Sequence, residues 1–185
     1  MQLVLRILPI LIALTFYATD SSAQRRVRRA TAPSESSTHL TYDIGASTGT
    51  YNGFSYSEIT LGFNWFFMGH GANTLAWRNA IFNRFGSQSE NVLGVDSSLR
   101  YAYESPAEGG DLGYTIFGGP GYRLASSKYS GAFIEAGAVL KFGGLSLGAG
   151  LKSLNYSNPG KESDGTNMPK SDTVVFIILA GGGAL

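Results

Sequence analysis

Hydrophobic and polar residues alternate one by one along residues 56–68, YSEITLGFNWFFM. Successive side chains of a β-strand point to opposite faces, so this alternation predicts a strand with one apolar face and one polar face. The apolar parity consists of Ser57, Ile59, Leu61, Phe63, Trp65 and Phe67. The opposite parity consists of Tyr56, Glu58, Thr60, Gly62, Asn64 and Phe66. The two faces are therefore expected to meet two different environments.

The same alternation recurs from residue 40 onward, in segments of roughly 10 to 14 residues separated by turn-forming residues. Asn79 and Asn83 interrupt the apolar parity of one segment, and the last segment is apolar on both faces. No helical period is visible beyond the N-terminus. We predict strands near 40–51, 55–68, 74–85, 91–104, 112–124, 130–142, 145–156 and 173–185. The predicted fold class is therefore all-β, an eight-stranded antiparallel up-and-down β-barrel.

Parity alone does not show which face lies inside the barrel, because a soluble lipocalin-like carrier would enclose the apolar parity. Composition favours the reverse arrangement. Charged residues make up only 15% of the chain, against roughly 25% in a typical soluble domain. The polar parity also holds many of the 25 glycines, and a narrow, filled lumen needs small residues beside large ones. We therefore predict a polar lumen and an apolar wall that faces lipid, which makes this a transmembrane barrel.

The charges of the polar parity nearly balance, as a buried and paired network requires. The predicted turns place Glu58 near Arg84 and Glu135 near Lys152, and Glu104 falls on the same face. A charged lumen also fits a narrow ion pore, although a filled eight-stranded lumen leaves no continuous channel. We predict a structural lumen charge network formed by Asp43, Glu58, Arg78, Arg84, Asp96, Arg100, Arg123, Glu135, Lys141 and Lys152.

Aromatic residues of the apolar parity gather near the predicted turns, at both ends of the strands. Membrane-spanning barrels carry such aromatic girdles at their two water interfaces. The pattern therefore predicts that these residues mark the edges of the lipid-facing band. The predicted membrane-interface aromatics are Trp65, Phe67, Trp77, Phe85, Tyr101, Tyr103, Tyr114, Tyr122 and Phe142.

The N-terminal segment divides into two parts. Residues 1–23 are typical of a cleaved signal peptide, with a basic start, a short apolar run and small residues before the cleavage site. The apolar run is short for a membrane anchor, which needs roughly 20 apolar residues. Residues 24–38 contain an arginine cluster at Arg25–Arg29 and no period, so we predict a flexible basic periplasmic arm, either a solvated tail or a contact for an anionic partner. The barrel domain is expected over 39–185.

A signal sequence, MQLVLRILPILIALTFYATDSSA, precedes alternating strands such as SEITLGFNWFF and NVLGVDSSLRYAY and a polar parity of mixed charge. In these features the chain resembles the small eight-stranded outer-membrane barrels of the OmpA-transmembrane and OmpX-like families. The resemblance implies a bacterial outer-membrane location, insertion by the barrel-assembly machinery, contact with outer-membrane lipid and lipopolysaccharide, and termini that face the periplasm. These barrels commonly end in Phe or Trp, whereas this chain ends at Leu185. The external breaks would be 52–53, 86–90, 125–129 and 157–172.

Residue types that carry catalysis or bind metals are scarce. The chain has no cysteine, and His39 and His70 both fall at the predicted periplasmic end. The resemblance to outer-membrane barrels implies that lipid-modifying members would hold their histidines near the outer leaflet instead. We therefore expect no metal, no cofactor and no enzymatic activity. The net charge of +1 gives no indication of nucleic acid binding.

The predicted function is that of an integral outer-membrane β-barrel with a filled, charged lumen, acting as a structural or surface-interaction protein and as a monomer. The best candidate for an external contact is the loop 157–172, which combines Pro, Gly, Lys, Glu and Asp. The alternatives are a lipid-modifying outer-membrane enzyme, a narrow ion pore and a soluble lipocalin-like carrier.

Overall fold

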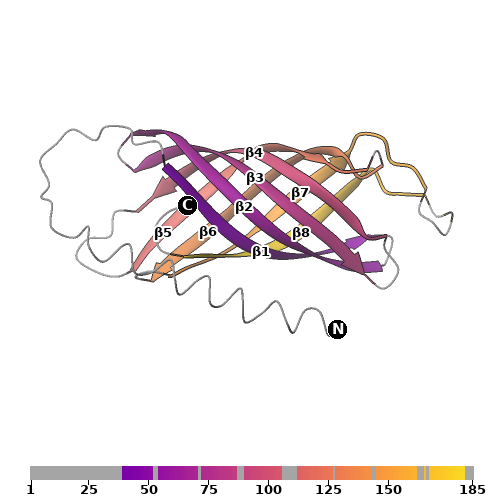
Figure 1. The fold of residues 1–185 in the computed structure, drawn as a ribbon, viewed down its shortest axis with the longest axis horizontal. Coiled ribbons are helices and arrows are strands. Elements are labelled where there is room, and N and C mark those ends of the chain that lie inside the picture. Colours follow the sequence, from indigo (N-terminus) through magenta and orange to yellow (C-terminus); the bar gives the residue numbers. More distant parts are fainter. Residues whose placement is uncertain are drawn as a thin grey trace, which may run out of the picture.

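A computed structural model of the chain describes residues 39–51, 54–70, 72–86, 90–105, 112–126, 128–142, 145–161, 165 and 167–181. These residues form a closed antiparallel barrel whose strands follow one another in chain order (Figure 1). The strands are β1 (His39–Tyr51), β2 (Phe54–His70), β3 (Asn73–Gly86), β4 (Val92–Glu104), β5 (Leu112–Leu124), β6 (Gly131–Phe142), β7 (Leu145–Tyr156) and β8 (Ser171–Gly181). The predicted all-β, eight-stranded up-and-down barrel is confirmed.

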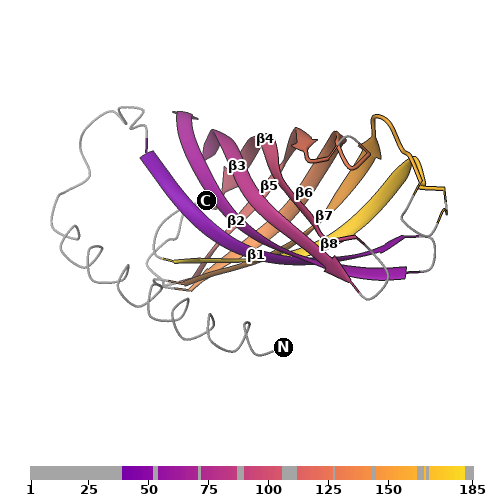
Figure 2. The ribbon, with the colours of Figure 1, turned by 45° about the vertical axis from the view of Figure 1, so that its right-hand side comes forward.

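Pairing between the first and last strands closes the barrel. Ile44 of β1 lies opposite Leu179 of β8, and Gly49 lies opposite Val174. Figure 2 shows the strands inclined to the long axis of the molecule, as closure of a sheet requires. Closure matters because a free sheet edge in lipid would leave backbone N–H and C=O groups without partners.

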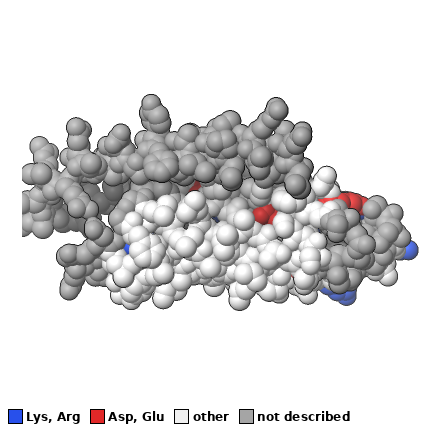
Figure 3. All heavy atoms as spheres, turned by 90° about the horizontal axis from the view of Figure 1, so that it is seen from below, with Lys and Arg blue, Asp and Glu red and all other residues white. Residues whose placement is uncertain are grey.

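The two faces of the barrel wall have opposite character. On β2, Ile59 is 47% exposed and Glu58 only 1%, and this alternation runs from Ser55 to Phe67. Figure 3, which shows one side of the molecule, has mostly uncharged atoms along the described wall. An apolar wall around a charged interior reverses the arrangement of a soluble protein, so lipid is the solvent that suits this surface. The arrangement therefore fits a membrane-spanning barrel and argues against the soluble carrier.

The last strand begins earlier than the sequence predicts. The turn residues predict a strand from 173 and assign Asp172 to an external loop, whereas β8 already includes Asp172 and buries it. The backbone N–H of Tyr156 donates to the carbonyl of Lys170 at 2.9 Å. Hydrogen bonding along β7 therefore continues past the predicted turn, and the inward parity extends to Asp172.

Some predicted segments lie outside the described residues. These are the signal peptide at 1–23, the basic arm at 24–38 and the last residues, 182–185. Within the described ranges, no helix is long and apolar enough to span a membrane.

Candidate functional site

The lumen is filled in three layers along its axis. Along β4, Val92 belongs to a cluster at one end, Asp96 and Arg100 to a layer of buried charges, and Ala102 to a second cluster at the other end. The hairpin end, at which β7 joins β8, holds Tyr56, Phe82, Val92, Tyr129, Phe133, Leu154, Tyr156, Met168 and Val174. The terminal end, at which β1 begins and β8 ends, holds Phe66, Ala76, Ala102, Phe117, Val139, Phe176 and Ile178.

The largest group of buried charges joins five strands. Arg123 Nη1 donates to Glu58 Oε1 at 2.7 Å, and its Nε donates to Asp96 Oδ1 at 2.7 Å. Arg84 Nε donates to Glu58 Oε1 at 2.8 Å, and Lys152 Nζ donates to Asp96 Oδ2 at 2.6 Å. None of these residues is more than 5% exposed. Each carboxylate is shared by two cations, which offsets the cost of removing the charges from water.

Two further buried pairs lie in the same layer. Arg78 Nη2 donates to Asp43 Oδ1 at 2.6 Å, and Asn64 Nδ2 donates to Asp43 Oδ2 at 2.9 Å. Arg100 Nε donates to Glu135 Oε1 at 2.8 Å. With these pairs, the buried charges of the described lumen comprise five acidic and five basic residues: Asp43, Glu58, Asp96, Glu135 and Asp172, with Arg78, Arg84, Arg100, Arg123 and Lys152.

The pairing differs from the sequence expectation at one point. Glu58 lies beside Arg84, as the turn positions indicate. Glu135 also lies opposite Lys152 in the β6–β7 register. However, Glu135 bonds to an arginine of β4, and Lys152 bonds to an aspartate of β4. Long side chains in a narrow lumen reach across it, so ion pairs form between strands that are not neighbours in the sheet.

Two residues lie at the edges of the charge layer. Lys141 was predicted to belong to it, and Asp172 was not. Lys141 is only half-buried and pairs with Glu104 at 2.6 Å. Asp172 accepts a hydrogen bond from the Tyr56 hydroxyl, and Arg84 Nη2 lies 4.0 Å from the same Asp172 oxygen. The alternation of the last strand could have predicted this burial, because Asp172 is in phase with the inward residues of that strand.

Glycines on the lumen face provide the space that aromatic rings occupy inside the barrel. A Cβ added to Gly121 would lie 2.3 Å from Phe133 Cζ, and one added to Gly150 would lie 2.4 Å from Phe176 Cζ. Lys152 Nζ lies 4.8 Å from the centre of the Phe133 ring, a cation–π contact. The lumen face therefore carries aromatic rings as well as charges. The glycines on the same face leave the space in which these rings fit.

Replacing Gly121 by alanine is expected to lower the free energy of unfolding by about 1–3 kcal/mol, because overpacking displaces a neighbouring ring. The new methyl group would meet both Phe133 and the carbonyl oxygen of Ser97, the latter at 2.7 Å. Urea unfolding of the refolded protein measures the change. Gly69→Ala is the matched control, because its Cβ would meet nothing closer than 3.7 Å. Equal losses in both variants would contradict the packing role of Gly121.

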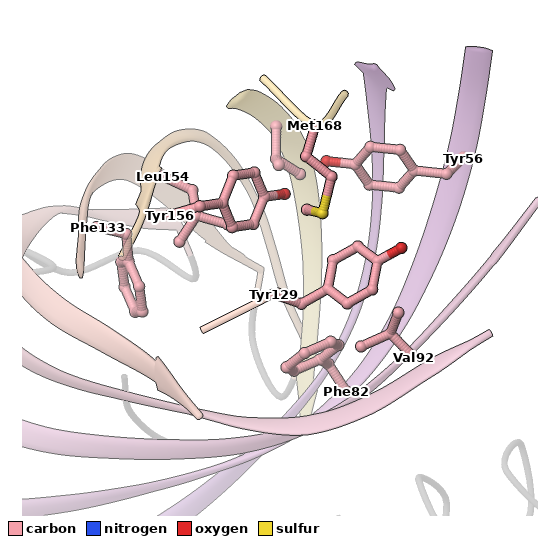
Figure 4. Packing of buried hydrophobic residues seen from close by; sticks show 9 residues of the cluster. Tyr56, Phe82, Val92, Tyr129, Phe133, Leu154, Tyr156 and Met168 are labelled. Carbon is pink, nitrogen blue, oxygen red and sulfur yellow. The ribbon is translucent and has the colours of Figure 1, made fainter. Parts of the chain in front are cut away.

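Residues from two separate turns cover the hairpin end of the lumen (Figure 4). Met168, which follows β7, is 6% exposed and packs in the cluster that includes Tyr56. Tyr129, from the turn between β5 and β6, is 2% exposed, and its ring meets that of Tyr156 edge-on at 6.4 Å between centroids. The hairpin end is therefore closed by side chains that originate outside the strands.

The described part of residues 157–170, named the β7–β8 hairpin, has internal order. Lys161 and Asn167 pair as an antiparallel bridge, and the N–H of Met168 donates to the carbonyl of Gly160 at 3.0 Å. Gly165 has a φ of 85°, a conformation that suits glycine. The sequence predicts a solvated loop here, whereas the described residues form a hairpin with a buried anchor.

Lys128 contacts two other connecting segments at the hairpin end of the barrel. Lys128 Nζ forms an ion pair with Glu90 Oε1 at 2.5 Å, and it also donates to the carbonyl of Lys161 at 3.2 Å. Glu90 precedes β4, Lys128 lies between β5 and β6, and Lys161 belongs to the β7–β8 hairpin. The hairpin is therefore fixed to its neighbours as well as to the lumen.

The described lumen provides no continuous path for ions. The cavity beside Arg100 measures only about 20 Å³, and apolar clusters fill both ends. The described residues therefore give no support to the narrow-pore alternative.

The predicted membrane-interface aromatics all lie on the outer face of the wall. Their exposed fractions range from 39% for Phe67 to 56% for Tyr101. Trp77 Nε1 donates to Ser97 Oγ at 2.8 Å, and the Tyr101 hydroxyl donates to Asn73 Oδ1 at 2.7 Å. Such bonds satisfy the polar tips of rings whose bodies face lipid.

The two histidines lie at the terminal end of the barrel. His39 begins β1 and His70 ends β2, and these strands are antiparallel neighbours. Across the described ranges, no three His, Asp or Glu residues form a group that could hold a metal ion.

Comparison of the chain with known proteins finds a similar fold and no related sequence. No family model matches the chain, and no curated protein matches it. The crystal structure of the outer membrane enzyme PagL matches with a TM-score of 0.49 and 16% sequence identity, over 74% of this chain and 97% of that chain. At this identity the likeness concerns the fold alone. The expectation that the chain is not an enzyme is corrected here, because the matched structure is that of an outer membrane enzyme.

Proposed function

We propose that this chain is an integral protein of the bacterial outer membrane that acts in surface interaction, using the β7–β8 hairpin to contact the phosphorylated headgroups of lipopolysaccharide. The observation that carries the proposal is the fixation of this hairpin. Met168 anchors it in the lumen, and Lys128 bonds to its backbone at Lys161. A surface loop fixed on both sides loses little conformational entropy when it binds a partner.

Two lysines of the hairpin, a segment that also contains Glu162 and Asp164, can donate to an anionic partner. Lys161 and Lys170 are both exposed, and each ammonium group can donate up to three hydrogen bonds to phosphate oxygens. Lysines that approach an anionic membrane surface contribute about 1 kcal/mol each to binding. The described hairpin thus presents cations where the wall of the barrel meets the headgroups.

The outer wall changes character toward the hairpin end, which supports this orientation. Exposed hydroxyl and amide side chains lie there among apolar ones such as Phe85 and Leu124, whereas the terminal end carries residues such as Leu40, Trp65 and Phe142. Sugar headgroups offer hydrogen bonds to such polar side chains, and acyl chains do not. The polar residues of the outer wall near the hairpin end are Thr48, Ser57, Asn83, Ser153, Asn155 and Thr173.

Replacing Lys161 and Lys170 by glutamine together is expected to weaken the binding of lipopolysaccharide to phosphatidylcholine vesicles that hold the folded protein by about 30-fold, since two lysines contribute about 2 kcal/mol. Association of lipopolysaccharide with these vesicles, compared with vesicles that hold no protein, measures this. The binding that remains should also depend less on salt, because screening acts on the lost charges.

Lys141→Gln is the matched control for the double variant. It removes one lysine charge at the terminal end of the barrel, where Lys141 pairs with Glu104, and it should leave vesicle binding unchanged. Unchanged binding in the double variant, or an equal loss in the control, would overturn the proposed contact.

A further inference from the structure

A groove crosses the outer wall of the barrel over strands β2 to β5. Its volume is about 530 Å³, and sites that bind small molecules measure about 300–1,000 Å³. Aromatic rings form its rim, with Phe67 near the terminal end of β2 and Tyr122 near the hairpin end of β5. The groove therefore extends along the wall, from the terminal end toward the hairpin end.

The floor of the groove is a place where the regular pairing of β4 with β5 lapses. The register pairs Ser98 with Gly121 and resumes only at Tyr101 and Gly118. Pro120 lies within this interval and lines the groove, and a proline has no N–H to donate to a strand ladder. The compact proline ring and the neighbouring Gly121 therefore leave the wall hollow at this point.

A serine hydroxyl lies in the groove and keeps its own proton to donate. Ser97 lines the groove, and its Oγ accepts a hydrogen bond from Trp77 Nε1 at 2.8 Å. A serine hydroxyl can also donate, and none of the described residues accepts from Ser97. Because a polar group without a partner is costly in lipid, the groove favours an occupant that brings an oxygen acceptor to Ser97.

The hairpin end of the groove adjoins the surface proposed above to contact lipopolysaccharide. The Tyr122 hydroxyl shares a hydrogen bond with Ser157 Oγ at 3.1 Å. Ser157 is the first residue of the β7–β8 hairpin, which also holds Lys161 and Lys170. A lipid whose headgroup contacts this hairpin therefore has its acyl chains on the same side of the wall as the groove. The acyl chains of lipopolysaccharide carry ester, amide and hydroxyl oxygens, which can accept from Ser97.

We propose that the groove binds one acyl chain of the lipopolysaccharide molecule whose phosphorylated headgroup contacts the β7–β8 hairpin. This site rests on the proposed function, because the same lipid occupies both places. The aromatic rim holds the chain, and the Ser97 hydroxyl donates to one of its oxygens. A chain of a zwitterionic phospholipid fits the same rim, but its headgroup lacks the net negative charge that the lysines of the hairpin attract.

The chain has two tryptophans, which provide a matched pair of fluorescent probes. Trp77 lines the groove, whereas Trp65 lies opposite it on β2, is 49% exposed and does not line the groove. The variants Trp65→Phe and Trp77→Phe would be refolded in phosphatidylcholine vesicles with brominated acyl chains, which quench a tryptophan on contact. We expect added lipopolysaccharide to displace these chains from the groove and to restore most of the Trp77 fluorescence, while Trp65 stays quenched. Fluorescence is divided by that in ordinary phosphatidylcholine vesicles, so only bromine contact is measured.

Three other results would overturn the acyl-chain site. If Trp77 stays as quenched as Trp65 while lipopolysaccharide associates with the vesicles, phospholipid fills the groove and the hairpin contact stands alone. If Trp77 is already shielded before lipopolysaccharide is added, a second copy of the chain covers the groove. If lipopolysaccharide associates no better than with vesicles that hold no protein, the proposed function fails and the acyl-chain site fails with it.

A variant that fills the groove tests the same site by exclusion. Combined with Trp65→Phe, Ser97→Phe places a ring in the groove and should abolish the recovery of Trp77 fluorescence. Ala149→Phe is the matched control, because Ala149 is also exposed on the outer wall but lies on β7, outside the groove. It should retain the recovery, and equal recovery in both variants would contradict binding in the groove.

Discussion

Glu58→Gln is expected to lower the free energy of unfolding by about 3–5 kcal/mol, because it leaves buried cations without their partner. Glu58 accepts hydrogen bonds from Arg84 at 2.8 Å and from Arg123 at 2.7 Å, and it is 1% exposed. Glutamine preserves the shape of the side chain and removes its charge. Urea unfolding in lipid vesicles, followed by the change in gel migration of the unfolded barrel, measures the loss.

The control for Glu58 is a second glutamate that also pairs with a cation. Glu104 contacts Lys141 at 2.6 Å, but its side chain is 40% exposed, so Glu104→Gln should cost less than about 1 kcal/mol. A loss in Glu58→Gln no larger than that of Glu104→Gln would contradict the claim that the charge layer stabilises the barrel.

The strands and their faces could be predicted because the barrel wall separates two media along its whole length. Each residue of β2 from Ser55 to Phe67 faces either the outside or the lumen, so residues 56–67 follow a strict period of two. The contact between Glu58 and Arg84 was expected from the turn positions, and the register that places them opposite each other includes a β-bulge between Phe66 and Met68. Local information was therefore sufficient for the faces of the strand.

The contacts across the lumen could not be predicted in the same way. Arg100 of β4 bonds to Glu135 of β6, and Arg123 of β5 bonds to Glu58 of β2. These pairs depend on the width of the barrel and on the stagger of its strands, which neighbouring residues do not reveal. The sequence therefore indicates which charges lie inside but not which of them pair.

Two features of the hairpin end were hidden for a different reason. Met168 stands alone in a polar segment, so no period marks it as buried. Asp172 follows turn-forming residues, and its charge suggests a solvated position. In the structure Met168 packs in the cluster at the hairpin end, and Asp172 points into the lumen because β8 already begins at Ser171. Their burial depends on where they lie at the hairpin end of the barrel and not on their residue type.

Leu151→Arg is expected to destabilise the barrel in a bilayer by about 2–4 kcal/mol, the cost of an arginine on the lipid face near the membrane midplane. Leu151 lies near the middle of β7 and is 55% exposed on the outer wall. In a soluble barrel the same change would place a charge in water, where most surface substitutions have little effect. Urea unfolding in lipid vesicles therefore tests whether this wall faces lipid.

Ser153→Arg is the matched control, because Ser153 is on the same strand and the same face, two positions closer to the hairpin end. An arginine near the interface should cost only about 0–1 kcal/mol. The difference between the two variants thus reports the depth of each position in the membrane. Equal effects at both positions, together with a protein that stays dispersed without detergent, would contradict the assignment of this wall to lipid.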